Sequence, residues 1–368
     1  MDLNKKILFL ASEFPPGPGG IGRHTYYLCR QFAERNWKVK ALVNQDYCSG
    51  GERRIFNKKL NYKIENFRRF SPVILLKLYK IIKTFIACLF FSPDIIILSG
   101  ISSLKLGWFL KKIFNKPVLA LLHGDEAVSK DGLVSKAYLA ADKIIAISNF
   151  TKDNFSIKGI EKDKVRVIYC GISDKFKKSD NRRDTSNTIL TVGNLTERKG
   201  QDIVVRALED VVKVCPNVKY VMAGLLTQKE QITEIARRVG VFEKLEFKGV
   251  VTEEELLTLY HNSTLFVLPS RKTEKSMEGF GLVALEAMAC GCPVIVSDET
   301  GIFEIIKKII PECVFHAGDK KDLAEKISYF LNDTDVRENI SSKCIKLSQA
   351  FRWKNICKEY EEEINKLL

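Results

Sequence analysis

The sequence predicts an α/β protein built from two doubly wound domains, each a parallel sheet covered by helices. Short runs of aliphatic and β-branched residues alternate along the chain with longer segments of helical periodicity. This alternation is typical of parallel sheets with crossover helices. A polar segment near the middle separates two such series, and 368 residues suit two domains better than one core.

The expected strands are short and apolar on both faces, as buried parallel strands are. In the first half they are KKILFLAS, WKVKALVN, DIIILSG, PVLALLHG, KIIAISN and VRVIY, and in the second half TILTVGN, VKYVMAG, KLEFKGV, STLFVLPS and PVIVSD. Helical patterns cover Ile21–Arg35 and Leu75–Phe91. The short apolar run near the N-terminus lacks a small-residue cleavage site, so we interpret it as the first strand and not as a signal peptide.

Residues 172–187 are polar, charged and almost free of large apolar side chains, which is typical of a linker. We therefore predict an N-terminal, acceptor-binding domain over residues 1–175 and a C-terminal, donor-binding domain over residues 176–350. The helical pattern of residues 351–368 is expected to pack back on the first domain. Two open α/β sheets joined in this way face each other across a cleft at the carboxyl ends of their strands, where ligands bind.

The composition is that of a soluble globular protein, with 45% hydrophobic and 28% charged residues. The ten cysteines form no C-x-x-C pair, and several lie in apolar runs. Buried, reduced thiols explain this pattern best and indicate a reducing, cytoplasmic compartment. The most apolar stretch, residues 84–93, is much shorter than the roughly 20 residues of a transmembrane helix.

The net charge of +14 is concentrated in the first half of the chain. Residues 1–175 hold 30 Lys and Arg against 15 Asp and Glu, whereas residues 176–368 hold 29 against 30. Anionic lipid, a phosphorylated acceptor or nucleic acid would be attracted by this field, and a solvated lysine-rich surface is the plain alternative. We favour an anionic membrane surface over nucleic acid because most of the cations are dispersed lysines.

The best candidate for part of a membrane-facing basic surface is one helix of the first half. Lys77, Lys80 and Lys83 recur at three-residue spacing on it, close in sequence to Arg68 and Arg69. The expected attraction is electrostatic and needs no apolar anchor.

A glycine-rich segment, Gly17–Gly22, formally fits the G-x-G-x-x-G pattern of dinucleotide sites. Four residues, Glu13–Pro16, separate it from the preceding strand, and the second expected strand ends at Asn44 without an acidic residue. Both features disfavour a dinucleotide. A glycine loop that opens a helix still favours phosphate through its free N–H groups. A turn with only a structural role is the alternative.

The strongest motif is EGFGLVALEAMACGCPVI, which begins at Glu278. Gly279 and Gly281 allow the backbone to approach a ligand at the start of a helix. Glu286 then falls among apolar neighbours, where a carboxylate is costly unless it is hydrogen-bonded. A sugar diol would supply two donors, and an arginine could do the same.

These segments resemble the retaining glycosyltransferase family four, whose fold, GT-B, has two Rossmann-like domains. Glu278 and Glu286, separated by seven residues, resemble its donor-site signature, and PPGPGGIGRH its N-terminal glycine loop. HGDE at His123–Glu126 is similar to its histidine motif and Ser148–Thr151 to its serine segment. VGNLTERKGQD, FKGV, LPS and FRW follow in the family's order, so the resemblance runs from about residue 8 to residue 356.

The resemblance implies a role for each matching residue. Glu278 would bind hydroxyls of the transferred sugar, and Glu286 the ribose diol. His123 would lie under the donor sugar near the reacting carbon, which makes His123 and Glu278 the catalytic candidates; a histidine that caps a helix is the alternative for His123. The remaining donor-binding candidates are Gly20, Ile21, Asn194, Arg198, Lys199, Phe280, Gly281 and Leu282.

Asn194 departs from the family, which usually has arginine at that position. Asparagine donates a hydrogen bond but carries no charge, so Arg198 is the candidate to replace it. His24 follows in the glycine-loop helix and is expected to be structural or to face the acceptor.

No cofactor and no metal are expected. A glycosyl–diphosphate bond leaves negative charge on the leaving group, which Lys199, the glycine loop and the helix start at Gly281 can neutralise. The one Asp-x-Asp segment, Asp333–Asp335, is interpreted as a helix cap.

The predicted function is transfer of a sugar, with retention, from a GDP- or UDP-linked donor to a glycan or lipid-linked acceptor. No pair of carboxylates suits double displacement, and the resemblance implies a front-face mechanism. The expected setting is surface polysaccharide synthesis (lipopolysaccharide, capsule or exopolysaccharide), peripheral on the inner face of the cytoplasmic membrane. The alternatives are another GT-B enzyme, such as a nucleotide-sugar epimerase or a glucan synthase, and a basic nucleic-acid-binding protein.

Overall fold

The structure, a computed structural model, describes residues 5–17, 19–46, 48–68, 70–179 and 187–368. It divides into an N-terminal unit, Met1–Gly171 with Trp353–Leu368, and a C-terminal unit, Ile172–Arg352. The sequence had put these boundaries at 175/176 and 350/351. Residues 180–186 of the expected linker, together with Pro18 and Arg69, lie outside the described residues.

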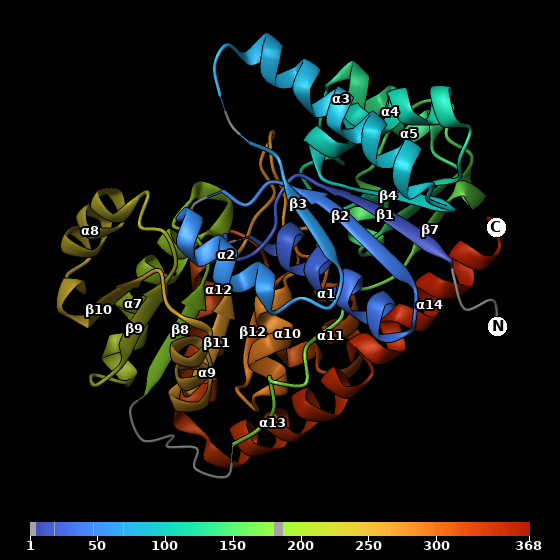
Figure 1. The fold of residues 1–368 in the computed structure, drawn as a ribbon. Coiled ribbons are helices and arrows are strands. Elements are labelled where there is room, and N and C mark those ends of the chain that lie inside the picture. Colours follow the sequence, from blue (N-terminus) through green and yellow to red (C-terminus); the bar gives the residue numbers. More distant parts are fainter. Residues whose placement is uncertain (1–4, 18, 47, 69, 180–186) are drawn as a thin grey trace. The chain divides into compact units, whose positions relative to one another are not determined.

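The N-terminal unit is a parallel seven-stranded sheet in the described residues, in the order β3-β2-β1-β4-β5-β6-β7. Helices α3, α4 and α5 lie on one face and α1 and α14 on the other (Figure 1). The strands are β1 (Lys6–Ala11), β2 (Lys38–Val43), β3 (Lys63–Asn66), β4 (Ile95–Ser99), β5 (Val118–Leu122), β6 (Lys143–Ala146) and β7 (Val165–Val167). The helices are α1 (Gly20–Glu34), α2 (Gly50–Lys58), α3 (Val73–Phe91), α4 (Ile101–Phe114), α5 (Gly132–Ala140), α6 (Asn149–Asp153) and α14 (Trp353–Asn365).

The C-terminal unit is a second parallel sheet, with the described order β10-β9-β8-β11-β12-β13. Its strands are β8 (Thr188–Val192), β9 (Lys219–Ala223), β10 (Leu245–Gly249), β11 (Leu265–Leu268), β12 (Val294–Ser297) and β13 (Val314–Phe315). Its helices are α7 (Gln201–Val214), α8 (Lys229–Arg238), α9 (Glu253–Asn262), α10 (Leu282–Ala289), α11 (Phe303–Ile309), α12 (Lys320–Asn332) and α13 (Thr334–Gln349). Both units thus confirm the predicted doubly wound α/β class.

Every expected strand is present, and the two that the sequence analysis missed lie at sheet edges. β3 is the four-residue segment KIEN, and β13 has two residues. Edge strands bury only part of their surface, so they lack the continuous apolar run by which central strands such as β4 are recognised. The cysteine prediction is confirmed: all ten are free thiols and nine are buried.

The predicted cap at Asp333 is also confirmed. Its carboxylate accepts the backbone N–H of Val336 at 3.0 Å at the start of α13. Within the described residues, no helix is long and apolar enough to cross a membrane.

The basic face expected on the Leu75–Phe91 helix is not formed, and that prediction is wrong. Lys80 and Lys83 turn inward on α3: each ammonium lies over the Phe67 ring, and Lys83 donates to the Asn66 carbonyl at 3.0 Å. Only Lys77 of the three is exposed. Successive helical residues turn by about 100°, so the three lysines spread over about 120° of the helix, and their spacing does not show which part of that arc faces the sheet.

Helix α14 belongs to the N-terminal unit, where it packs against α1. The Tyr360 hydroxyl lies 3.1 Å from His24 Nε2, and the Trp353 ring stacks on Tyr27 with centroids 5.8 Å apart. Trp37 and Arg35 both donate to the Glu361 carboxylate at 3.0 Å. His24 therefore has a structural role, which is one of the two roles expected for it from the sequence.

We predict that Gly171→Ala destabilises the packing of α14. A Cβ at this position would lie 2.4 Å from Cδ2 of Trp353, and overpacking of this kind typically costs about 1–3 kcal/mol. Thermal unfolding should show a lower Tm. The matched control is Gly132→Ala at the start of α5, where an added Cβ meets nothing within 4 Å. Equal Tm values for the two variants would contradict the close contact.

Candidate active site

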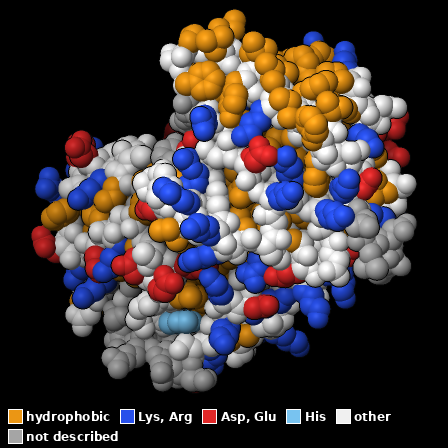
Figure 2. Space-filling view, in the orientation of Figure 1, with side chains coloured by type: hydrophobic (Ala, Val, Ile, Leu, Met, Phe, Trp, Pro, Cys, Tyr) orange, Lys and Arg blue, Asp and Glu red, His pale blue; other side chains and the backbone are white. Residues whose placement is uncertain are grey.

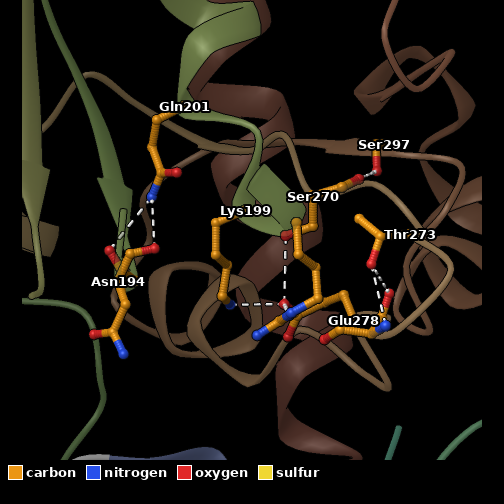
Figure 3. A network of polar contacts seen from close by, with 10 residues as sticks. Asn194, Lys199, Gln201, Ser270, Thr273, Glu278 and Ser297 are labelled. Carbon is orange, nitrogen blue, oxygen red and sulfur yellow. Dashed lines mark hydrogen bonds and ion pairs between the residues drawn. The ribbon is translucent and has the colours of Figure 1, made fainter. Parts of the chain in front are cut away.

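The candidate site of the C-terminal unit lies at the carboxyl edge of its sheet. Lys199 ends a short 3₁₀ segment, Glu197–Lys199, that follows β8, and Ser270 comes directly after β11. Glu278 lies in the loop that leads to α10. Parallel strands all end at the same edge, which is why these loops meet there (Figure 3).

Backbone contacts hold the first two loops together. The Arg271 N–H donates to the Arg198 carbonyl at 2.8 Å. Gly200 has φ of +69°, and a Cβ there would lie 2.0 Å from the Pro269 carbonyl oxygen. A glycine is therefore required where the two loops cross.

The Glu278 carboxylate is the centre of the polar network. Its Oε2 accepts from Lys199 Nζ at 2.6 Å, from Ser270 Oγ at 3.3 Å and from the Arg198 guanidinium. Burial by itself would raise the pKa of Glu278, but the charges and hydrogen bonds of Lys199 and Arg198 outweigh it and lower the pKa to about 2. The carboxylate is thus ionised at ordinary pH, and the cluster keeps one net positive charge.

This ion cluster was not anticipated from the sequence. Glu278 and Lys199 had been given separate partners, the sugar hydroxyls and the diphosphate. Arg198 had been expected only as a substitute for a charge missing at position 194. Its guanidinium reaches Glu278 and therefore shares one site with Lys199.

Asn194 has a different role in the described contacts. Its side-chain oxygen accepts the Leu225 N–H at 3.1 Å, which connects the loop after β8 to the loop after β9. Its carbonyl accepts from Gln201 Nε2 at 3.3 Å (Figure 3). The asparagine braces the loop that carries Lys199.

The helix start at α10 brings backbone amides to the same edge. Gly281 precedes the helix with φ of +100°, and a Cβ there would lie 2.6 Å from Leu268 Cδ2. Phe280 is 2% exposed and packs near Phe351, with ring centroids 6.4 Å apart. The ring of Phe280 is therefore used in packing. Leu282, the first helical residue, is half-buried.

Glu286 lies within α10 and is only 1% exposed. Its Oε2 accepts from the hydroxyl of Tyr260, on α9, at 2.9 Å. The sequence had suggested a sugar diol or an arginine as the partner. Tyr260 was missed because an aromatic residue in a helical pattern indicates core packing, and nothing in the pattern showed where its hydroxyl points.

In the N-terminal unit, His123 stands directly after β5 and is 4% exposed. Its Nε2 lies 2.9 Å from Ser99 Oγ, which in turn lies 2.7 Å from Thr25 Oγ1 of α1. Burial lowers the pKa of His123 to about 4, so the ring is neutral at pH 7. The His24 ring stands edge-on at 5.3 Å. His123 is thus held by a serine rather than acting as a helix cap.

Glu126, the last residue of HGDE, was missed as a functional residue. Its Oε2 accepts the backbone N–H of His123 at 3.2 Å and of Gly124 at 3.1 Å, which fixes the loop that carries the histidine. Burial raises the pKa of Glu126 to about 7. Its position three residues after His123, the spacing of the glutamate in a capping box, was the available signal.

Gly20 and Ile21 are the first two residues of α1. Gly20 is exposed, and an added Cβ would meet nothing within 4 Å. Ile21 is half-buried, and its carbonyl accepts the Thr25 hydroxyl at 3.0 Å. Both belong to the N-terminal unit, whereas Lys199 and Glu278 belong to the other.

The N-terminal unit also has a cavity of about 610 Å³ that the sequence did not suggest. It opens at the carboxyl ends of β1 and β2, beside the first turns of α3 and α4. Lys80 Nζ donates to Asn44 Oδ1 at 3.3 Å in its wall. The lining residues are Ser12, Asn44, Asp46, Phe70, Leu76, Lys80 and Ser102.

The fold and the charged edge of the second sheet define a class of protein, the GT-B glycosyltransferases. Over 98% of this chain, the structure matches all of Anabaena Alr3699/HepE, solved in complex with UDP and glucose, with a TM-score of 0.78 and 20% identity. Sequence models agree: "Glycosyltransferase Family 4" matches residues 18–176 and "Glycosyl transferases group 1" matches residues 172–346.

Two curated relatives support the same assignment. An uncharacterized glycosyltransferase of Methanocaldococcus jannaschii, MJ1607, is 32% identical over 68% of this chain and 69% of its own length. The capsular polysaccharide biosynthesis glycosyltransferase CapM of Staphylococcus aureus is 27% identical over 63% of each chain. The chain belongs to the group 1 glycosyltransferases, with a family 4 N-terminal domain.

We predict that Glu126→Gln removes a pH dependence of stability. The folded-state pKa of about 7 lies above the ordinary glutamate pKa of 4.5, so between these two pH values the folded protein holds a proton that the unfolded chain has lost. The proton on Glu126 contributes about 3 kcal/mol to the free energy of unfolding. This contribution is complete below pH 4.5 and is lost as the pH rises through 7. Glutamine imitates the protonated acid, so the Tm of the variant should fall less between pH 5 and pH 8.

The matched control is Glu161→Gln, because Glu161 is exposed. This variant should keep the wild-type dependence of Tm on pH. If Glu126→Gln also keeps it, Glu126 does not titrate in this range.

Proposed function

We propose that the protein transfers a sugar, with retention, from a UDP- or GDP-linked donor to a glycan or lipid-linked acceptor. The observation that carries this proposal is the cluster of Glu278 with Lys199 and Arg198, directly before the start of α10. A site of one net positive charge, next to the N-terminus of α10, suits a diphosphate.

The roles follow from charge and geometry. Lys199 and Arg198 neutralise the charge that develops on the leaving diphosphate, together with the amides of Phe280, Gly281 and Leu282. Because Glu278 holds both cations in place before the donor arrives, they need little reorganisation in the transition state. The same carboxylate is available to accept hydroxyls of the transferred sugar. No metal is needed in this scheme, and no group of three or more His, Cys, Asp or Glu in the described residues is arranged to hold one.

Two further assignments rest on the family resemblance. Glu286 binds the ribose diol of the donor, and neutral His123 offers its ring to the donor sugar while Gly20 and Ile21 contact the diphosphate. Retention follows from a front-face reaction, in which a leaving-group oxygen accepts the proton of the acceptor hydroxyl as the glycosidic bond forms. This route needs no carboxylate nucleophile.

We assign the acceptor to the cavity lined by Lys80, Asn44 and Ser12, at the carboxyl edge of the first sheet. The relatives include both a capsular polysaccharide glycosyltransferase and glycogen synthases, and the first of these supports surface polysaccharide synthesis. The basic excess of residues 1–175 favours a place on the anionic inner face of the cytoplasmic membrane. Nucleic acid is not expected as a partner.

The donor role of Glu286 predicts that Glu286→Gln weakens donor binding. Loss of a charged hydrogen-bond partner typically costs about 1.5–3 kcal/mol, which corresponds to a roughly ten- to hundredfold higher Kd. Calorimetry with UDP- and GDP-sugars measures it. Tyr260→Phe is the matched control, because it removes one internal hydrogen bond to the carboxylate but keeps the charge. Unchanged affinity in Glu286→Gln would mean that this carboxylate serves the core alone.

We also predict that transfer survives EDTA, because protein groups alone neutralise the diphosphate. The measurement is sugar transfer after removal of divalent ions. Complete loss, restored by magnesium or manganese, would refute the metal-independent scheme.

A further inference from the structure

The outer surface of α3 and α4 is apolar to an extent unlike the rest of the described chain. In Figure 2 hydrophobic side chains gather over these two helices. Twelve of the twenty large hydrophobic side chains that the described residues expose lie here. We call them the α3–α4 face: Phe70, Val73, Ile74, Leu75, Leu78, Ile82, Phe85, Ile86, Leu89, Phe90, Phe109 and Ile113.

Helix α3 exposes apolar side chains on its outer side in addition to those, such as Ala87 and Cys88, that its inner side buries. A surface helix normally turns its apolar stripe to the core. Here Ile74, Leu78 and Ile82 recur four residues apart on the exposed side, and Phe90 is 81% exposed. The inward side holds Lys80 and Lys83, which contact Phe67. An apolar surface of this size marks a binding site for an apolar partner.

The charges around the face indicate the partner. Neither α3 nor α4 contains an aspartate or glutamate. Lys77 is exposed within the face, and exposed Lys112 lies 4.4 Å from the Trp108 ring at its edge. Apolar side chains bordered by lysine and tryptophan match a bilayer interface with anionic head groups. A second copy would bring like charges together, with no acidic residue on either helix to pair with them.

We propose that the α3–α4 face docks the protein on an anionic lipid bilayer, with its apolar side chains entering the boundary between head groups and acyl chains. Helix α3 would lie in the membrane plane rather than cross it, since 19 residues extend about 28 Å and its inward side packs on the sheet. The binding is therefore partly hydrophobic, whereas lysines alone would give binding that salt abolishes.

Docking on this face places the acceptor cavity at the lipid surface. Phe70 belongs to both the face and the cavity wall, and Leu76 and Lys80 of α3 line the same wall. A lipid-linked acceptor could keep its chain in the bilayer while its polar head group enters the cavity beside Lys80. This consequence rests on the proposed glycosyl transfer, whereas the docking itself does not.

The test is flotation of the full chain with vesicles of phosphatidylcholine, with and without phosphatidylglycerol, at low and high salt. The variant is Ile74→Gln/Leu78→Gln/Phe90→Gln. The matched control is Val214→Gln/Val250→Gln/Tyr329→Gln, at comparably exposed positions of the other unit. Wild type and control should bind anionic vesicles and keep measurable binding at high salt. Each substitution in the face should lower the partition by about tenfold.

Folding is checked by circular dichroism and by UDP affinity, which the variant should share with the wild type because none of its changes lies in the donor site. Wild type that floats with neither vesicle, or a variant that floats as well as wild type, would overturn the proposal. So would a wild-type dimer that the variant converts to monomer without any lipid binding. Failure of wild type to bind either UDP or GDP would instead count against the glycosyl transfer and leave the vesicle result to decide the docking.

Discussion

The site depends on one interaction, the ion cluster in which Glu278 holds Lys199 and Arg198. Two cations at the end of one short loop would repel each other and move apart in solvent. A carboxylate that is 13% exposed and accepts from both keeps them at the edge of the sheet. The cluster also links the loop after β8 to the loop before α10, so the charge and the helix amides share a fixed position. Preorganised charge of this kind is what stabilises a developing diphosphate.

At the carboxyl edge of its sheet the N-terminal unit has the neutral ring of His123, whereas the C-terminal unit has the ion cluster of Glu278 at the same edge of its own sheet. His123 is kept uncharged by burial and is oriented by Ser99, and Glu126 fixes the backbone on which it stands. A neutral imidazole can donate or accept a hydrogen bond without attracting the anionic leaving group. The two units therefore differ in electrostatics at corresponding edges of similar sheets, as the proposed separation of acceptor and donor binding requires.

Much of this architecture could be predicted from the sequence, because central parallel strands are continuous apolar runs and their carboxyl ends gather at one edge. That reasoning found the start of α10 at Gly281, whereas Lys199 and Glu278 were identified through the family resemblance. The partners of buried polar groups could not be found in this way. Tyr260 and the Lys199–Glu278 pair are contacts between segments far apart in the chain, and no local pattern records them.

The orientation of α3 shows the same limit in another form. Its sequence is apolar around most of its circumference, so periodicity does not decide which side faces the sheet. Three lysines suggested a basic outer surface, whereas two of them are used against Phe67, Glu65 and Asn66 on the inner side. Long lysine side chains can reach polar partners at the edge of a core, and this freedom let the large aliphatic residues turn outward.

The central claim, that Lys199 binds the diphosphate of the donor, is tested most directly by calorimetry on Lys199→Ala with UDP and uridine, or with GDP and guanosine if the wild type binds GDP instead. We predict a Kd for the nucleoside diphosphate about ten- to hundredfold higher than that of the wild type, with binding of the nucleoside unchanged. The matched control is Lys213→Ala, which removes an exposed lysine paired with Asp210 and should leave both affinities as they are. A Lys199→Ala variant that binds the nucleoside diphosphate as tightly as the wild type would contradict the claim.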